Sequence, residues 1–329
     1  MANVSDSAAR SAEIMVLSRP SRSLWADAWS RLIRNKAAIV GMVVIAVFIF
    51  VALFGPLLAP HNPLQIYDGK STLPPAWVEK SVTGKAGESR FLLGTDSIGR
   101  DLLSRIIYGA RVSMIVGLTP VLIILVIGIV IGLVSGYSSA KVDNLLMRFT
   151  DVIYAFPDLL FYIIMMISLR ETVLGRMMNG LMLLFVALAV VSWVGVARLV
   201  RGQVLSLKNK EFIEAARCIG SSDTQIMSRH ILPNCLSPLV VWMAFAIPRM
   251  IIIEAVLGYL GIGLRPATNP NALFITSWGV LLQEGNTTIN SQPWILLAPA
   301  ICVALVVMAF TFLGDGLRDA LDPRMRGTM

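Results

Sequence analysis

Three charged residues stand inside long apolar runs, and they are the first candidates for chemistry in this 329-residue chain: Asp158, Arg249 and Glu254. A charge at the centre of a bilayer costs ~2.5–3.5 kcal/mol on the insertion scale, so these side chains should face protein or water. Arg249 and Glu254 point to different faces of a helix and cannot pair simply. Pro157 and Pro248 directly precede Asp158 and Arg249, and proline loosens a helix at such points. We predict that the three charges line a pathway through the membrane or pair with a second, homologous subunit; another interpretation makes Glu254 an interfacial charge near the outer surface.

Patterns for catalysis, metal binding or nucleotide binding are absent from the sequence. The cysteines are scattered and form no Cys-x-x-Cys pair, and the two histidines are far apart. No phosphate-binding loop occurs, and no Ser-His-Asp arrangement presents itself. We therefore expect no catalytic residue, no cofactor and no metal site. The residues considered are Cys218, Cys235, Cys302, His61 and His230.

The composition is that of a membrane protein. Hydrophobic residues make up 56% of the chain and charged residues 15%, so lipid is expected to be the main solvent. The net charge of +8 comes from Lys and Arg spread between apolar runs, with no basic stripe and no nucleic-acid module. Such charges are typical of the flanks of membrane spans. A nucleic-acid partner is therefore not expected.

Six apolar runs are long enough to cross the hydrocarbon core, which takes ~20 helical residues. We predict an all-α integral membrane protein with six transmembrane helices. The first run is too long for a cleavable signal and follows a long polar segment, so it is expected to stay as an anchor. In the second run, glycines at four-residue spacing favour close helix packing, either within the subunit or between subunits. The runs are Ala37–Ala59, Val112–Gly136, Val152–Leu169, Met177–Ala197, Leu236–Leu257 and Pro293–Gly314, and the glycines are Gly128, Gly132 and Gly136.

The distribution of Lys and Arg predicts the orientation. They are concentrated before the first run, between the fourth and fifth runs, and in the tail, so both termini should be cytoplasmic. This gives four parts. They are a cytoplasmic N-terminal segment (1–36), the first membrane helix with an external loop and an interfacial helix (37–110), a five-helix core containing a cytoplasmic loop at 201–235 (111–314), and a cytoplasmic tail (315–329).

The external loop ends in a helical pattern. Asp101 is a suitable N-cap, and Leu102, Leu103, Ile106 and Ile107 form one apolar stripe after it. We predict an amphipathic helix lying at the outer interface. It would anchor the loop, or serve as a gate or a docking site for a receptor.

The cytoplasmic loop between the fourth and fifth runs has the pattern of two short helices. In the first, Phe212, Ala215, Ala216 and Ile219 make one apolar face, and Gly220 ends the helix. The next face carries Lys210, Glu214 and Arg217 at ion-pair spacing. A capping box at Ser222 and Gln225 starts the second helix, and Pro233 limits it. Two such helices would either dock into a groove on a cytoplasmic protein or fold back on the chain's own spans, with Glu214 merely pairing its neighbours.

The same loop resembles the EAA loop of ABC importer permeases. The shared residues are Glu214-Ala215-Ala216, Gly220 and Ile231-Leu232-Pro233; the general family pattern prefers an aliphatic residue where this chain has His230. Arg229 to Asn234 is closer to the peptide-uptake branch. The overall match, from about Leu24 onward, resembles the second (C-type) permease subunit of an oligopeptide or dipeptide importer. The other matching stretches are Gly94-Thr95-Asp96, Gly99-Arg100-Asp101, Phe212 to Ala216 and Gly314 to Pro323.

The resemblance implies a type I importer in a bacterial inner membrane. A homologous sister permease would complete the pathway, two cytoplasmic ATPase subunits would bind the loops and hydrolyse ATP, and an extracytoplasmic binding protein would deliver the peptide. Rocking of the spans would then give alternating access. The residues that the resemblance places in the ATPase-coupling region are Glu214, Ala215, Ala216, Gly220, His230 and Pro233.

Three alternatives remain open on the sequence. A permease of the same family could carry nickel or another small solute. A secondary transporter driven by an ion gradient would use Asp158 or Glu254 as its proton site, but it should show internal repeats and leaves the cytoplasmic loop unexplained. A purely structural membrane protein would not need buried charges.

Overall fold

The computed structural model describes residues 24–265, 267, 269 and 272–322. Within these residues the regular structure is helical, apart from an isolated bridge between Thr95 and Asp101, so the predicted all-α class is confirmed. The helices are α2 (Leu24–Leu32), α3 (Lys36–Leu58), α4 (Leu102–Tyr137), α5 (Ala140–Tyr154), α6 (Asp158–Ser168), α7 (Val173–Arg176), η1 (Met177–Gly180), α8 (Leu181–Leu207), α9 (Glu211–Cys218), α10 (Asp223–Ile226), η2 (Met227–Ile231), α11 (Leu232–Tyr259), α12 (Trp278–Asn286) and α13 (Trp294–Leu321).

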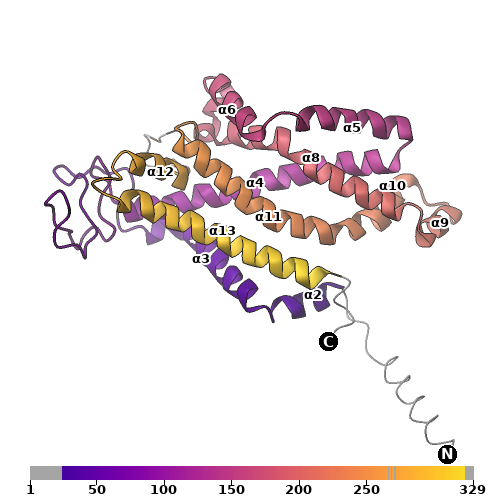
Figure 1. The fold of residues 1–329 in the computed structure, drawn as a ribbon, viewed down its shortest axis with the longest axis horizontal. Coiled ribbons are helices and arrows are strands. Elements are labelled where there is room, and N and C mark those ends of the chain that lie inside the picture. Colours follow the sequence, from indigo (N-terminus) through magenta and orange to yellow (C-terminus); the bar gives the residue numbers. More distant parts are fainter. Residues whose placement is uncertain (1–23, 266, 268, 270–271, 323–329) are drawn as a thin grey trace, which may run out of the picture.

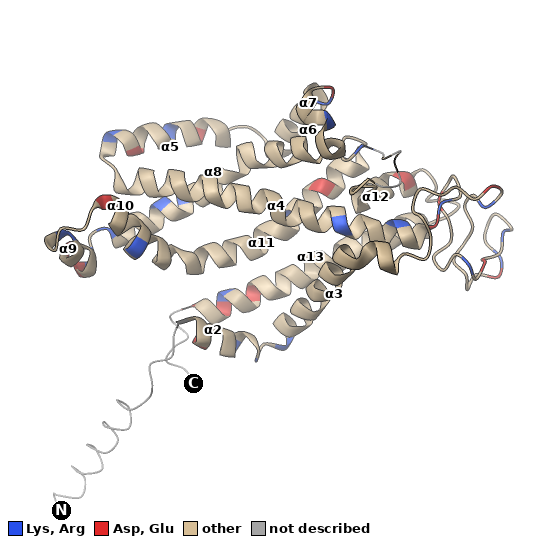
Figure 2. Ribbon diagram, turned by 180° about the vertical axis from the view of Figure 1, so that it is seen from behind, with Lys and Arg blue, Asp and Glu red and all other residues tan. Residues whose placement is uncertain are grey.

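The long helices form one elongated bundle. Helix α4 packs against α3, α8 and α11, while α13 packs against α3 and α11. The loop at 60–101 lies at one end of the bundle and α9 with α10 at the other (Figure 1). Seen from behind, most of the helical surface between these ends carries no charge (Figure 2). Following the orientation predicted from the sequence, we call the end with the loop at 60–101 the outer end and the end with α9 and α10 the inner end.

Five helices or joined helices of the described residues are long and apolar enough to cross a membrane, and a bent pair raises the number to six. The bent pair is α5 with α6, which meet at 77°. The predicted straight third span, Val152–Leu169, is therefore wrong. Pro157 lies at the break, where it lacks an amide N–H and disfavours helical geometry at the residue before it. The break places Asp158 at the first position of α6.

The second span and the external helix are one element. The carboxylate of Asp101 accepts a hydrogen bond from the Ser104 amide at 2.9 Å, as an N-cap should. The helix then continues without interruption for 36 residues to Tyr137, a length of ~54 Å. The separate interfacial helix predicted from the stripe after Asp101 is therefore wrong. Its residues are the first turns of α4, which is longer than the ~30 Å hydrocarbon core.

The glycine face of α4 packs within the chain. A Cβ added at Gly132 would lie 2.6 Å from the carbonyl oxygen of Ala197, and Gly128 and Gly136 approach Val196 and Val204 in the same way. These contacts place α4 against α8 at a distance that only glycine allows. Of the two interpretations of the glycine spacing, the structure supports packing inside the subunit.

The predicted ends of the last spans are too early. Helix α8 begins only after Met178 and Asn179, which both have positive φ, and it continues to Leu207 rather than ending at Ala197. Helix α13 continues past Gly314 to Leu321, through part of the predicted tail. In the predicted N-terminal segment, α2 packs on α13; residues 1–23 and 323–329 lie outside the described part of the chain.

Candidate functional site

The inner loop contains the two predicted short helices, with the predicted stop and start signals between them. Helix α9 covers Glu211–Cys218, and Gly220 follows in the left-handed region at φ +82°. The capping box is formed: the Gln225 amide donates to the Ser222 hydroxyl at 3.4 Å, and the Ser222 amide donates to the Gln225 side chain at 3.1 Å. Local sequence signals therefore suffice to define where these two short helices begin and end.

Most of the predicted apolar face of α9 does not pack on the chain itself. Ile213 and Ala216 are buried, together with Ile226 and Ile231 from the returning segment. Phe212 is 45% exposed and Ile219 is 83% exposed, so of the predicted face Ala216 alone folds back on the described part of the chain. The inward contact uses two positions on an eight-residue helix, which is too short for apolar spacing alone to determine it. Phe212, Glu214, Ala215 and Ile219 are consequently left on the outer surface, with Ala215 and Glu214 also exposed.

Polar contacts join this loop to the inner end of α4. The hydroxyl of Tyr137 donates to Asp223 at 2.9 Å and accepts a hydrogen bond from Arg217 at 3.4 Å. The bond to Tyr137 raises the pKa of the Arg217 guanidinium above its ordinary value. Glu214, by contrast, makes no ion pair with any residue in the described part of the chain. The alternative in which Glu214 merely pairs with Lys210 and Arg217 is therefore not what the structure shows, and Glu214 is exposed.

Pro233 does not limit the second helix as predicted. Helix α10 passes through the π-helical turn η2 into α11, where Pro233 lies in the first turn. The π turn, where the helical hydrogen-bonding pattern changes, directly precedes this proline. His230 lies in the π turn, half-buried, and its carbonyl accepts a hydrogen bond from the Asn234 side chain at 2.7 Å. The inner loop is thus continuous with the long helix α11.

A second feature is an open cavity of about 540 Å³ between the α5–α6 break, α8 and α11. Asp158 and Arg249 meet in it: Arg249 Nη2 donates to Asp158 Oδ2 at 2.7 Å, although 91 residues separate them. Their side chains are 37% and 62% exposed. The cavity can therefore offer a carboxylate and a guanidinium to a solute. Its other lining residues are Tyr154, Ala155, Phe156, Pro157, Val191, Ser192, Val194, Gly195, Trp242, Phe245, Ala246 and Met250.

Glu254 lies away from that cavity. It is buried where α11 meets α4 and α12, and its Oε2 accepts a hydrogen bond from the Ser113 hydroxyl at 3.3 Å. The Ser113 hydroxyl in turn accepts one from the Trp278 amide at 3.3 Å. The interpretation of Glu254 as an interfacial charge near the surface is wrong, and the structure gives it no place beside Asp158 and Arg249. As predicted, Arg249 and Glu254 do not pair.

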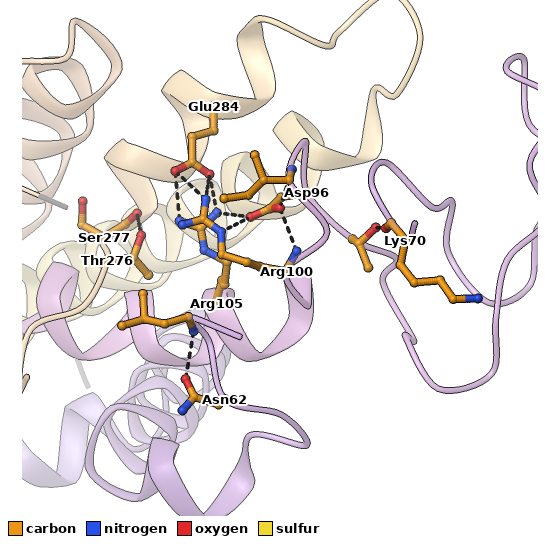
Figure 3. Close-up of polar contacts among 11 residues, drawn as sticks. Asn62, Lys70, Asp96, Arg100, Arg105, Thr276, Ser277 and Glu284 are labelled. Atoms are coloured by element: carbon orange, nitrogen blue, oxygen red, sulfur yellow. Dashed lines mark hydrogen bonds and ion pairs between the residues drawn. The ribbon is translucent and has the colours of Figure 1, made fainter. Parts of the chain in front are cut away.

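A cluster of four charges at the outer end was not identified from the sequence (Figure 3). Asp96 accepts from Arg100 and Arg105 at 2.6 Å each, and Glu284 on α12 accepts from both arginines. Asp96 and Arg105 are buried. The cluster ties the loop at 60–101 and the start of α4 to α12. The motif Gly94-Thr95-Asp96 with Gly99-Arg100-Asp101 contains two of its members, but no spacing signal connects them to Glu284.

These features define the class of protein. An all-helical bundle with five or six membrane-crossing segments, a charged cavity between them and a helical hairpin exposed at one end is a membrane permease. Within the described residues, no three His, Cys, Asp or Glu side chains lie together where they could hold a metal ion.

The chain belongs to the binding-protein-dependent transport system inner membrane component family, whose model matches residues 128–327. A second family model, the N-terminal TM domain of oligopeptide transport permease C, matches residues 23–75. The protein is accordingly a multi-pass permease of an ABC importer in the inner membrane. The predicted family resemblance is confirmed.

Relatives match along most of their length. The dipeptide transport system permease protein DppC of Bacillus subtilis (strain 168) is 37% identical over 94% of this chain and 88% of its own. The oligopeptide transport system permease protein OppC of Escherichia coli (strain K12) is 39% identical over 93% of each chain. A solved inward-facing structure of the MetNI methionine ABC transporter covers 67% of this chain and 98% of its own, with a TM-score of 0.52 and 17% identity. This likeness supports the type I importer fold.

Proposed function

We propose that this chain is the membrane-spanning subunit of an ATP-driven peptide importer. It forms the pathway with a homologous sister permease, receives peptide from an extracytoplasmic binding protein, and is driven by two cytoplasmic ATPase subunits. The relatives named as dipeptide and oligopeptide permeases support the substrate class, because they match almost the whole chain. The observation that carries the mechanism is the solvent-exposed face of α9, which consists of Phe212, Glu214, Ala215 and Ile219.

The exposed face of α9 is suited to an ATPase surface. Phe212 and Ile219 present apolar area to solvent, and the exposed Glu214 and Ala215 lie between them in the sequence. Small and apolar side chains on a short helix fit a groove on a partner. Gly220 and the π turn containing His230, followed by Pro233, shape the return of the chain to α11. We assign these residues to coupling, with this loop and both termini on the cytoplasmic side.

The connections of α9 to the membrane helices would transmit the movement of the ATPases. Helix α9 is tied to α4 through Tyr137, and its return segment continues directly into α11. Closure of the ATPases on ATP would therefore move the inner ends of two membrane helices at once. Such rigid-body movement of helices around a fixed site is the basis of alternating access.

The cavity containing Asp158 and Arg249 is the proposed wall of the pathway. Both side chains are partly exposed on the helical bundle, and charges avoid lipid, so this face should meet water and the sister permease. A peptide carries an ammonium and a carboxylate, which match the two charges. A nickel ion fits less well, because the carboxylate of Asp158 that would bind it is already paired with Arg249. An ion-driven transporter would leave the exposed face of α9 without a purpose.

The test is a charge reversal in α9. The chain is co-purified with its sister permease and ATPases, and peptide-stimulated ATP hydrolysis is compared for wild type and Glu214→Lys. We expect weaker association and at least a several-fold loss of stimulation, since the reversed charge would face the ATPase surface. Glu79→Lys, an exposed carboxylate in the loop at the opposite end, is the matched control and should behave as wild type. Equal association and equal stimulation in Glu214→Lys would refute the coupling role.

A further inference from the structure

A second exposed ion pair adjoins the pathway cavity. Arg198 on α8 donates to Asp151 on α5 at 2.7 Å, and the two side chains are 40% and 66% exposed. The Arg198 guanidinium also lies over the ring of Tyr154, 4.5 Å from its centroid. Tyr154 is itself a lining residue of the cavity. One aromatic ring is therefore shared by the cavity and by this pair.

The helix geometry of α8 supports the same continuity. Val191 and Gly195 line the cavity, and Arg198 follows them at the spacing that keeps residues on one helix face. Arg198 thus extends the cavity wall by about one turn in the direction of α9. A charged side chain does not face hydrocarbon without a cost, so the face belongs to water or to a polar partner surface.

The ion pairs Arg198–Asp151 and Arg249–Asp158 differ in exposure from the buried pair of Asp96 and Arg105. Asp96 and Arg105 are buried and held by several partners, so their contacts are fixed. An exposed pair is weak, because water screens it and competes for both groups. Arg198 with Asp151 resembles Arg249 with Asp158 in this respect. Both pairs can exchange partners with a passing charged solute.

The next ion pair along α8, Arg201 with Asp143, does not belong to this series of exposed pairs. Arg201 donates through Nε and Nη2 to the two oxygens of Asp143, at 2.6 Å each, and Ser135 on α4 donates to the same carboxylate. This bidentate arrangement is more covered than the Arg198 pair. It fixes α5 to α8 and α4 and leaves the carboxylate of Asp143 fully engaged.

We propose that Arg198, Asp151 and Tyr154 form a second station for the charged ends of a peptide, on the α9 side of the Asp158–Arg249 cavity. This inference rests on the proposed function and deepens it. The carboxylate of a peptide would bind Arg198 through charge-assisted hydrogen bonds. The ammonium of a peptide would bind Asp151 and the ring of Tyr154. Two opposite-charge pairs in series let a zwitterionic solute move without leaving either of its charges unpaired.

The first experiment asks whether this face is wet. Gly195 is exposed, and an added Cβ would meet only Trp242 Nε1, at 3.9 Å, so cysteine fits there. In the assembled importer with Cys218, Cys235 and Cys302 replaced by serine or alanine, Gly195→Cys should react with water-soluble charged thiol reagents. Val126→Cys, on the exposed apolar side of α4, is the control and should not react. Adding Arg198→Gln should lower the ratio of anionic to cationic reagent rates on the order of fivefold, and Arg198→Lys should restore it.

The second experiment asks which end of the peptide each residue meets. Proteoliposomes containing the assembled importer take up one peptide with free ends, one with an amidated carboxyl end and one with an acetylated amino end, each first shown to bind the binding protein. Arg198→Gln should lower uptake of the free peptide several-fold and spare the amidated one. Asp151→Asn should instead spare the acetylated one. Arg176→Gln, in an exposed pair with Glu171 elsewhere, should match wild type.

The outcomes separate the station from the function. If the unmodified assembly imports no peptide, the proposed function is wrong and the peptide station falls with it. If the unmodified assembly imports peptide but the Gly195→Cys variant stays unreactive, or Arg198→Gln and Asp151→Asn lower uptake of all three peptides equally or not at all, the station alone is wrong. A reactive Gly195→Cys variant together with end-selective losses supports the proposal.

Discussion

Arg105 and Asp96 are buried in the outer end of the chain, and each depends on the other for its charge to be tolerated. Asp96 also accepts hydrogen bonds from the amides of Ile98 at 3.0 Å and Arg100 at 2.9 Å, so its carboxylate is surrounded by donors. Burying a charge is expensive unless it is paired and hydrogen-bonded. The cluster is therefore a structural lock between the loop at 60–101 and α12, with no charge left over for a solute.

Asp96→Ala is expected to destabilise the folded chain strongly. Without Asp96, two arginines share the single carboxylate of Glu284, and a buried positive charge left uncompensated costs about 3–5 kcal/mol. The measurement is denaturant unfolding in detergent, followed by the fluorescence of Trp278 and the other tryptophans. Glu88→Ala removes the carboxylate of a half-exposed ion pair with Lys70 in the same loop and should cost much less. Equal midpoints for the two variants would show that the cluster is not a lock.

At the scale of the helices, close packing between α4 and α8 depends on missing side chains. Gly132→Ala would place a methyl group 2.6 Å from the Ala197 carbonyl oxygen, against backbone that cannot move aside. We expect a loss of roughly 1–3 kcal/mol, as for other overpacked interiors. Gly202→Ala is the matched control, because an added Cβ there meets nothing within 4 Å. It should be neutral or stabilise by about 0.5–1 kcal/mol. Thermal unfolding of both variants in the same detergent measures the difference, and equal stability would mean that α4 can move away from α8.

The helices also show how far the sequence alone could go. The N-cap at Asp101, the stop at Gly220 and the capping box at Ser222 were predictable, because each depends on residues within one turn. The pairing of Arg249 with Asp158 was not, since it depends on how α6 and α11 meet across 91 residues. The buried face of α9 was also missed. Ile213 packs because the chain returns over it, which apolar spacing does not record.

For the whole molecule, the main question is which end faces the cytoplasm. Cys218 on α9 is exposed, whereas Cys235 is buried and Cys302 half-buried, so the chain has one readily accessible thiol among the residues described. With the ATPases absent, Cys218 should react with a membrane-impermeant thiol reagent in inside-out vesicles and not in intact cells. Trp77→Cys, on the exposed loop at the opposite end, should show the reverse pattern. Adding the ATPases should protect Cys218. Labelling of Cys218 in intact cells would invert the proposed topology.

Arg249 and α10, the second helix of the inner loop, belong to one continuous rod, because α10, the π turn and α11 follow one another without a break. Asp158 belongs to another body, since α6 begins beyond the 77° bend. A movement of this rod by the ATPases would therefore change the distance between Asp158 and Arg249, even if no solute were present. The importer would then loosen its hold on its cargo in time with nucleotide turnover, rather than waiting for the cargo to escape by chance.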